Sequence, residues 1–131
     1  MTKYYWCSEK TKKKIEEETP EPEQAPIIFM SGPDSGHSDA CIDVLDNTIM
    51  FYGEVNEKNA KLLNKAIRVL DKELQIFRLK YGCPSPPLKL FINSYGGSVF
   101  AGFSIMDTIL NCKTPVHSYI DGSAASAATL I

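Results

Sequence analysis

Three short apolar runs, at residues 48–52, 88–92 and 115–120, have the length and the β-branched or aromatic content of strands. After the first run, apolar residues recur every three or four positions from Leu62 to Phe77, and this spacing predicts one apolar face of a helix. The apolar positions between Val99 and Leu110 predict a second helix. The pattern therefore reads strand, helix, strand, helix, strand.

A third helix is predicted to begin at Ser126. Alternating strands and helices are typical of right-handed βαβ crossovers, so the sequence predicts an α/β fold with parallel strands. Glycine-bearing turns at 93–98 and 121–126 each follow a strand. Because ligands in such sheets bind beyond the carboxyl ends of the strands, we expect both turns at one functional edge.

Residues 1–45 differ from residues 46–131 in composition. A basic stretch at Lys10–Lys14 precedes an acidic one at Glu16–Glu18, and prolines and a turn-rich segment follow. Such a segment buries too little apolar surface to offset the entropy of ordering the chain. We expect a mostly flexible arm over 1–45, a solvated tail rather than a partner-binding segment, and a folded domain over 46–131.

The overall composition narrows the function classes. With 131 residues, 44% of them hydrophobic and 23% charged, the chain fits one soluble globular domain. A formal net charge of -2 gives no reason to expect binding to nucleic acid or to a membrane surface. No apolar run approaches the roughly 18 residues that span a bilayer, and the first residues do not form a secretory signal. Four cysteines and two histidines show no metal-ligand spacing, so we expect no metal site and free thiols.

The segment from Gly122 to Ala128 places a serine, Ser126, among small residues between a strand and a helix. Small neighbours let a substrate carbonyl approach, and the N–H groups at a helix start favour an oxyanion. The same segment is also explained by a serine that caps a helix and by alanines that let helices pack closely. Taken alone, this segment favours the structural interpretation.

The turn at residues 93–98 contains paired glycines, Gly96 and Gly97, directly after a strand. Their backbone N–H groups are suited to an oxyanion hole or to a phosphate at the next helix start. Neither nucleotide-binding glycine spacing is present, which makes nucleotide binding the weaker option. Alone, this turn is also compatible with a simple connection.

Together the two turns are specific. Ile92-Asn-Ser-x-Gly-Gly-Ser-Val, Ala101-Gly, Ile105-x-Asp-Thr-Ile and Gly122-x-Ala-Ala-Ser resemble the proteolytic subunit of the ATP-dependent Clp protease, over about Ile49 to Ile131. The resemblance implies the Clp/crotonase fold, with repeated β-β-α units and a largely parallel sheet. It also implies a serine endopeptidase that cleaves unfolded polypeptides inside a ring chamber.

The resemblance assigns roles to four residues. Ser126 matches the nucleophile, Gly97 and Ala127 match the donors of the oxyanion-hole N–H groups, and Val99 matches a position whose backbone pairs with extended substrate. The family implies a homo- or hetero-oligomeric ring of peptidase subunits fed by an AAA+ ATPase unfoldase. ATP is used by that partner, and no cofactor is bound directly. The expected location is the cytoplasm, or an organelle stroma or matrix.

Two features depart from the family. Tyr95 stands where a proline is usual, which loosens the turn. The family's base histidine and its orienting aspartate lie downstream of the serine, and neither is present here. His117 lies beyond hydrogen-bond reach along its strand, and His37 lies in the arm. The chain therefore corresponds to a truncated N-terminal portion and is expected to be inactive alone.

Two alternatives remain open at this point. One is a non-catalytic regulatory or ring-partner subunit, which the missing base favours. The other is a crotonase-like acyl-CoA enzyme, because the folds are related and oxyanion holes recur there. A serine between alanines, Ser126, disfavours the second alternative.

Overall fold

The computed structural model describes residues 9–18 and 40–131. Residues 9–18 form one helix, α1 (Glu9–Glu18), inside the segment that the sequence assigned to a mostly flexible arm. This stretch contains lysine, glutamate, threonine and one isoleucine but no glycine or proline, so its residues favour the helix. The rest of the predicted arm before residue 40 lies outside the described residues.

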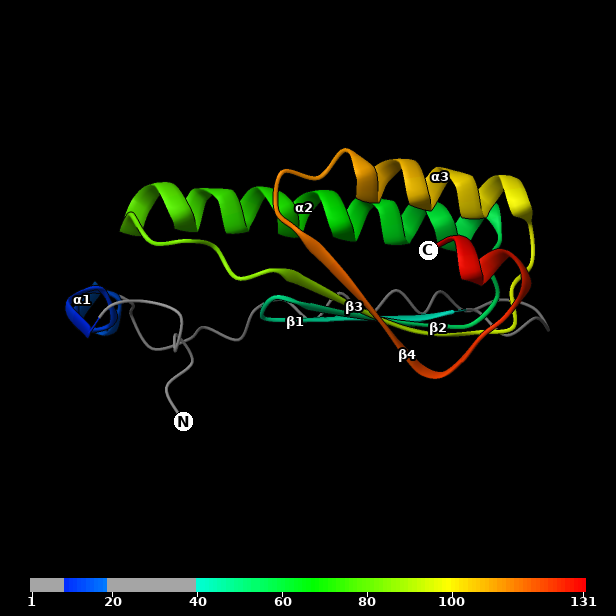
Figure 1. Cartoon of the computed structure of the whole chain (residues 1–131), viewed down its shortest axis with the longest axis horizontal. Coiled ribbons are helices and arrows are strands. Elements are labelled where there is room, and N and C mark those ends of the chain that lie inside the picture. Colours follow the sequence, from blue (N-terminus) through cyan, green and yellow to red (C-terminus); the bar gives the residue numbers. More distant parts are fainter. Residues whose placement is uncertain (1–8, 19–39) are drawn as a thin grey trace.

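The remainder of the described chain is a four-stranded sheet with two long helices on one of its faces (Figure 1). The strands are β1 (Cys41–Leu45), β2 (Thr48–Tyr52), β3 (Leu88–Ser94) and β4 (Val116–Ala124). They lie in the order β1-β2-β3-β4; β1 pairs antiparallel with β2, and the other two pairs are parallel. The α/β fold with a largely parallel sheet and a β-β-α unit is confirmed.

Strand β1 corrects the domain boundary that the sequence suggested. Residues 41–45 pair with β2 along their whole length and therefore belong to the sheet, not to the arm. Leu45 lies opposite Thr48, which leaves a two-residue hairpin turn, and Asp46 in this turn has a φ of 54°. Tight hairpin turns require such left-handed residues, and aspartate tolerates them.

Helix α2 (Glu57–Tyr81) connects β2 to β3 and is capped at both ends. The side chain of Asn56 accepts a hydrogen bond from the N–H of Asn59 at 2.8 Å and so caps the start of the helix. Gly82, with a φ of 64°, ends the helix by donating its N–H to the carbonyl of Arg78. The core between α2 and the sheet contains Ile49, Phe51, Leu63, Ile67, Leu70, Leu74, Leu88, Leu90 and Ile92.

Helix α3 (Val99–Leu110) connects β3 to β4 and lies beside α2. Ile105 is buried as predicted, but Val99, Phe103 and Leu110 are exposed, and the helix buries Thr108 instead. The pattern of apolar residues was misleading here because the contact between the two helices is partly polar.

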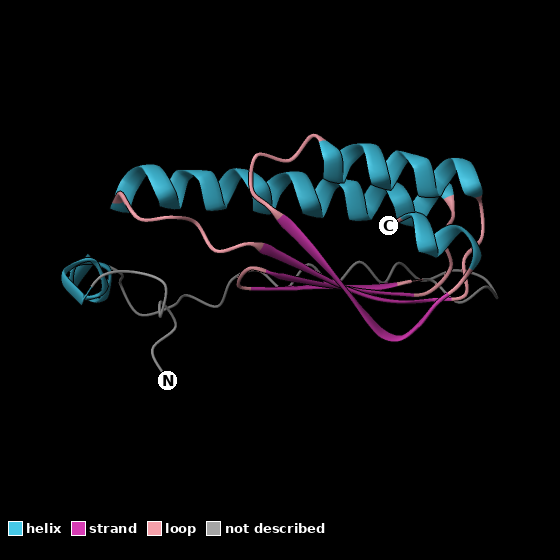
Figure 2. Ribbon diagram, viewed as in Figure 1, coloured by secondary structure: helices cyan, strands magenta, loops and turns pink. Residues whose placement is uncertain are grey.

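Strand β4 extends to Ala124, four residues beyond the predicted end at 120. Ile92 pairs with Ile120, and Ser94 pairs with Ala124. One residue of β3, Asn93, therefore faces the three residues 121–123 of β4, and these extra residues form a bulge. After β4 the chain forms a short 3-10 helix, η1 (Ser126–Leu130), where the sequence predicted the start of an α-helix (Figure 2). The φ of 52° at Ser126 lies outside the right-handed helical region, so right-handed helical backbone angles begin only after this residue.

Candidate active site

Three connections meet beyond the carboxyl ends of the parallel strands, as the sequence predicted for its two glycine-bearing turns. The N–H of Val55, in the connection after β2, donates to the carbonyl of Gly96 at 2.9 Å. The N–H of Ala125, in the connection after β4, donates to the carbonyl of Ser94 at 3.0 Å. The turn after β3 is thus held from both sides, and the two turns form one unit.

Ser126 is exposed at the start of η1, with its backbone in the left-handed region at a φ of 52°. For a residue other than glycine this conformation costs about 1–2 kcal/mol. A nucleophile held on a sharp turn between a strand and a helix presents its hydroxyl in the same way. Ser126 therefore lies on a sharp, solvent-exposed turn between β4 and η1.

Gly96 is the glycine that packs directly against this serine. A Cβ atom at Gly96 would lie 2.6 Å from the carbonyl oxygen of Ala125, 2.7 Å from the Cβ of Ser126 and 3.0 Å from the backbone nitrogen of Ala127. Gly96 is buried and has a φ of +100°. The sequence analysis named both glycines as possible donors, but the family resemblance gave a role only to Gly97, and the close packing of Gly96 against Ser126 was not predicted.

Gly97 is exposed and follows Gly96 in the same turn. Because the carbonyl of Gly96 accepts the N–H of Val55, and a trans peptide points its N–H and carbonyl in opposite directions, the N–H of Gly97 points away from Val55. The other face of Gly97 is filled, since a Cβ there would lie 2.3 Å from the carbonyl oxygen of Val55. The turn therefore fixes the direction of one backbone donor.

Val99 and Ala127 each lie near the start of a helical segment: Val99 begins α3 after the glycine turn, and Ala127 is the second residue of η1 after β4. The first backbone bond of η1 runs from the N–H of Ala128 to the carbonyl of Ala125, so the N–H of Ala127 precedes the helical bonding pattern. Val99 is the first residue of α3, after its N-cap Ser98, and its side chain is exposed. An N–H in the first helical turn has no partner within the helix, so Val99 can offer that one group to an extended chain.

A general base is not found next to Ser126 among residues 9–18 and 40–131. His117 is the second residue of β4 and pairs with Lys89, at the opposite end of the strand from Ala124. At about 3.3 Å per residue, the strand between His117 and Ala124 spans roughly 20 Å, which is far beyond hydrogen-bond reach. His37 lies outside the described residues.

The carboxylate of Asp121 has a different partner. It accepts a hydrogen bond from the hydroxyl of Tyr52, which reaches from β2 across β3. This hydrogen bond, with a smaller effect of desolvation, raises the pKa of Tyr52 above its ordinary value. Asp107 is exposed on α3 and lines a groove that Ser126 does not line.

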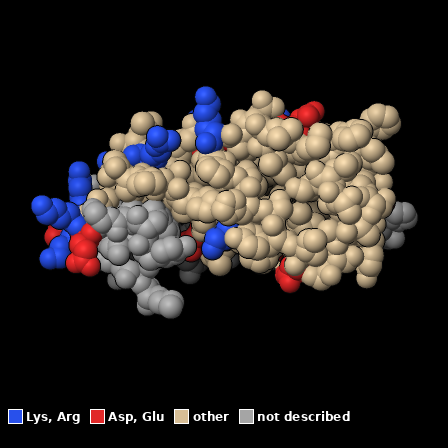
Figure 3. Space-filling model, viewed as in Figure 1, with Lys and Arg blue, Asp and Glu red and all other residues tan. Residues whose placement is uncertain are grey.

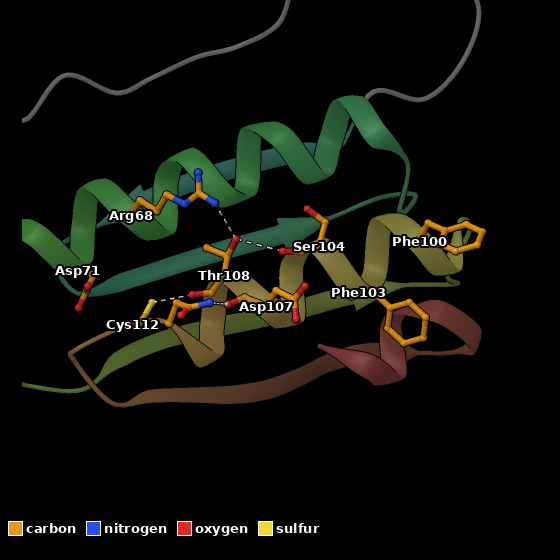
Figure 4. Close-up of a pocket in the computed structure, with 9 residues that line it drawn as sticks. Arg68, Asp71, Phe100, Phe103, Ser104, Asp107, Thr108 and Cys112 are labelled. Carbon is orange, nitrogen blue, oxygen red and sulfur yellow. Dashed lines mark hydrogen bonds between the residues drawn. The ribbon is translucent and has the colours of Figure 1, made fainter.

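That groove lies between α2 and α3 and has a volume of about 570 Å³ (Figure 4). Its lining residues are Arg68, Asp71, Phe100, Phe103, Ser104, Asp107, Thr108, Asn111 and Cys112. None of the predicted site residues belongs to this set. The candidate residues therefore lie at the carboxyl ends of the strands and do not line this groove.

Two further features concern the described parts of the chain, residues 9–18 and 40–131. No group of three metal-ligating side chains occurs there. Among the helices in the same residues, none is long and apolar enough to cross a bilayer.

Comparison with known proteins places the whole arrangement in one family. The family model described as Clp protease matches residues 35–131. The chain is 35% identical over 86 residues to the ATP-dependent Clp protease proteolytic subunit of Leuconostoc citreum, covering 66% of this chain and 38% of that protein. It is also 35% identical over 89 residues to proteolytic subunit 1 of Chlamydia muridarum, covering 67% of this chain and 42% of that protein. The chain thus spans about two fifths of the length of these relatives.

Solved structures agree with the sequence relatives. ClpP1 from Listeria monocytogenes matches with a TM-score of 0.55 and 32% identity, over 65% of this chain and 44% of that one. The ClpP protease catalytic domain from Plasmodium falciparum matches with a TM-score of 0.53 and 28% identity, over 63% of this chain and 42% of that one. With the family model covering about three quarters of the sequence, this chain belongs to the Clp protease family.

Proposed function

We propose that this chain contributes the nucleophile and the oxyanion hole of a Clp-type serine endopeptidase that cleaves unfolded polypeptides. The observation that carries the proposal is the approach of Gly96 to Ser126, which leaves no room for a Cβ between the two turns. Close contact of this kind is needed if one substrate carbonyl is to meet the hydroxyl and both donors at once. The names of the relatives support the same reaction.

In the proposed reaction the Oγ of Ser126 attacks the scissile carbonyl carbon. The N–H groups of Gly97 and Ala127 then stabilise the negative charge that develops on the carbonyl oxygen, and the backbone of Val99 aligns the substrate. A neutral hydroxyl is a poor nucleophile near pH 7 and requires a base. We propose that the base and its orienting acid come from outside residues 40–131.

The proposed setting is a ring of peptidase subunits supplied by an AAA+ unfoldase. The names of the relatives, ATP-dependent proteolytic subunits, support this setting. ATP is consumed by the unfoldase, and the peptidase chain itself binds no cofactor. We place the protein in the cytoplasm, or in the stroma or matrix of an organelle.

Labelling with a fluorophosphonate probe tests the proposal. The chain is treated alone, and also together with a full-length Clp proteolytic subunit whose nucleophilic serine has been replaced by alanine. Mass spectrometry should locate the label on Ser126, and the Ser126→Ala variant should remain unlabelled. Labelling only in the mixture shows that the base is supplied by another chain.

Absence of label from Ser126 under both conditions contradicts the peptidase proposal. Co-purification with the full-length subunit would then identify a non-catalytic ring partner. The relatives give this alternative, and the crotonase-like acyl-CoA enzyme, no support, since those named are proteolytic subunits.

A further inference from the structure

Ser94, the last residue of β3, joins the two turns of the site. Its carbonyl accepts the N–H of Ala125 at 3.0 Å, and its hydroxyl accepts the N–H of Gly96 at 3.1 Å. The first bond uses the main chain and is available to any residue. The second requires a side-chain oxygen at this position.

The hydroxyl of Ser94 lies where the sheet otherwise places apolar side chains. Along β3 the buried positions alternate, and they are occupied by Leu88, Leu90, Ile92 and finally Ser94, which is only 2% exposed. A buried hydroxyl is costly unless it is hydrogen-bonded. A position that breaks the apolar alternation of its own strand, beside the proposed nucleophile, indicates a selected role rather than a packing one.

The glycine turn at residues 93–98 needs contacts from outside its two glycines to hold one conformation. Gly96 and Gly97 have no side chains and φ values of 100° and 147°, so their backbone is unusually free. Two contacts hold this turn at Gly96: the hydroxyl of Ser94 at its N–H and the N–H of Val55 at its carbonyl. The Val55 contact holds the peptide that carries the Gly97 N–H, and the Ser94 contact holds the peptide before it. Without the Ser94 contact the preceding peptide can rotate, and the direction of the Gly97 N–H then depends on the Val55 contact alone.

We infer, on the basis of the proposed peptidase function, that Ser94 is a positioning residue that aligns the Gly97 N–H with the Ser126 nucleophile. Its hydroxyl acts through Gly96 and does not touch substrate. Its carbonyl, by holding Ala125, keeps the serine turn in register with the glycine turn.

Amide hydrogen exchange of the full chain, measured by NMR, tests the contact itself. In Ser94→Ala the Gly96 amide should exchange roughly fivefold to tenfold faster than in the wild type, and Ser94→Thr should restore slow exchange. The Gly53 amide, which donates to the carbonyl of Asn93, should be unchanged and reports that the fold is intact. Ser104→Ala is the matched control. This substitution also removes a hydroxyl that accepts a hydrogen bond, here from the side chain of Asn64, but Ser104 is on α3 and not in either turn of the site. Unchanged exchange at Gly96 in Ser94→Ala overturns the inference.

Fluorophosphonate labelling of Ser126, with the companion subunit present, tests the functional consequence. The maximal labelling rate of Ser94→Ala should fall roughly 10- to 100-fold while the half-saturating probe concentration stays the same, because alignment rather than binding is lost. Ser94→Thr should recover the rate, and Ser104→Ala should label like the wild type. Equal rates for Ser94→Ala and wild type overturn the inference. An unlabelled wild type contradicts the peptidase proposal instead, and the amide exchange then decides the role of Ser94.

Discussion

The packing around Ser126 depends on the absence of a Cβ atom at Gly96. Gly96 contacts the backbone on both sides of the serine at distances that a Cβ would not permit. Gly82 has a similar left-handed requirement, with a φ of +64°, but nothing lies within 4 Å of a Cβ there. The two glycines therefore separate the cost of the backbone conformation from the cost of the close approach.

Gly96→Ala is expected to destabilise the chain by about 3 kcal/mol, because the strained backbone and the overlap with Ala125 and Ser126 add together. Gly82→Ala should cost about 1 kcal/mol, since only the conformation is penalised. Urea unfolding of both variants measures the difference. Equal losses of stability in the two variants would show that the close approach is not maintained in solution.

Cys41 offers a second test at the scale of single residues. It is exposed, and its thiol donates to the carboxylate of Asp43 at 3.4 Å. This bond is the main reason why the pKa of Cys41 is raised; desolvation and the Asp43 charge add to it. In Asp43→Asn the pKa of Cys41 should fall, so that a larger fraction is thiolate at any given pH below it.

Alkylation by iodoacetamide, followed by mass spectrometry at each cysteine, should therefore be faster at Cys41 in Asp43→Asn, with its pH-rate profile displaced to lower pH. Cys112 is the internal control, because burial is the main cause of its raised pKa and Asp43 is not among the causes. A Cys41 profile that does not move would show that the thiol and carboxylate are not in contact.

At the scale of elements, the packing of α3 on α2 relies on polar side chains. Asn64 donates to Ser104 and Arg68 donates to Thr108, so polar pairs link the two helices. The carboxylate of Asp71, which is 9% exposed, accepts the N–H groups of Lys113 and Thr114 in the connection from α3 to β4. This carboxylate fixes the point at which the chain leaves α3 and enters the strand that leads to Ser126.

Asp71→Asn is expected to lower stability by about 1–3 kcal/mol, because one of the two acceptor oxygens becomes an N–H donor facing buried N–H groups. The Thr114 amide should lose protection from hydrogen exchange. Asp107→Asn, at an exposed position on α3, should change stability by no more than about 0.5 kcal/mol. If urea unfolding shows that Asp71→Asn keeps full stability, the Asp71 carboxylate does not anchor the connection from α3 to β4.

The hydroxyl of Tyr52 donates to the carboxylate of Asp121 and so links β2 to β4 across β3. This hydrogen bond is sensitive to alkaline pH because its donor is the proton that the phenol loses on ionising. The pKa of Tyr52 is raised in the folded chain, so the stabilisation is fully present below the ordinary tyrosine pKa, about 10, and is lost as the pH rises through the raised value. Wild type and Tyr52→Phe should differ in thermal stability near neutral pH and converge at high pH. A difference that persists at high pH would contradict this linkage.

The sequence allowed the regular elements to be predicted but not the contacts between distant segments. The 48–52 strand and the apolar face of α2 follow from the spacing of apolar residues along the chain, which is a local property. β1 was missed because its short run adjoins a turn-rich segment, although the Asp46-Asn47 pair between two apolar runs is a hairpin signal. The acceptor role of Asp71 and the packing of Gly96 depend on residues more than 25 positions away, and no local pattern encodes them.

For the molecule as a whole, charge and apolar exposure are distributed unevenly. Figure 3 shows lysine and arginine side chains gathered toward the end that carries α1 and the C-terminal end of α2, whereas the surface over α3 and η1 carries few charges. Exposed apolar side chains occur on several elements, and one cluster of them lies near the start of α3, at Tyr95, Val99, Phe100 and Phe103. Clustered exposed apolar residues are typical of surfaces that another chain covers, and the ring proposal supplies such a chain.

Phe100 and Leu79 form a matched pair for testing the ring proposal, with exposed fractions of 84% and 83%. Phe100 lies in the apolar cluster, whereas Leu79 lies between Arg78 and Lys80 near the end of α2. If the cluster is covered in the assembly, Phe100→Ser should weaken association with the full-length subunit about 30-fold, as expected for the loss of an aromatic anchor worth about 2 kcal/mol. Leu79→Ser removes a similar exposed side chain from a charged neighbourhood and should leave association unchanged. Sedimentation velocity over a concentration series compares the two variants; equal weakening, or none in either, would mean that the ring does not use the start of α3.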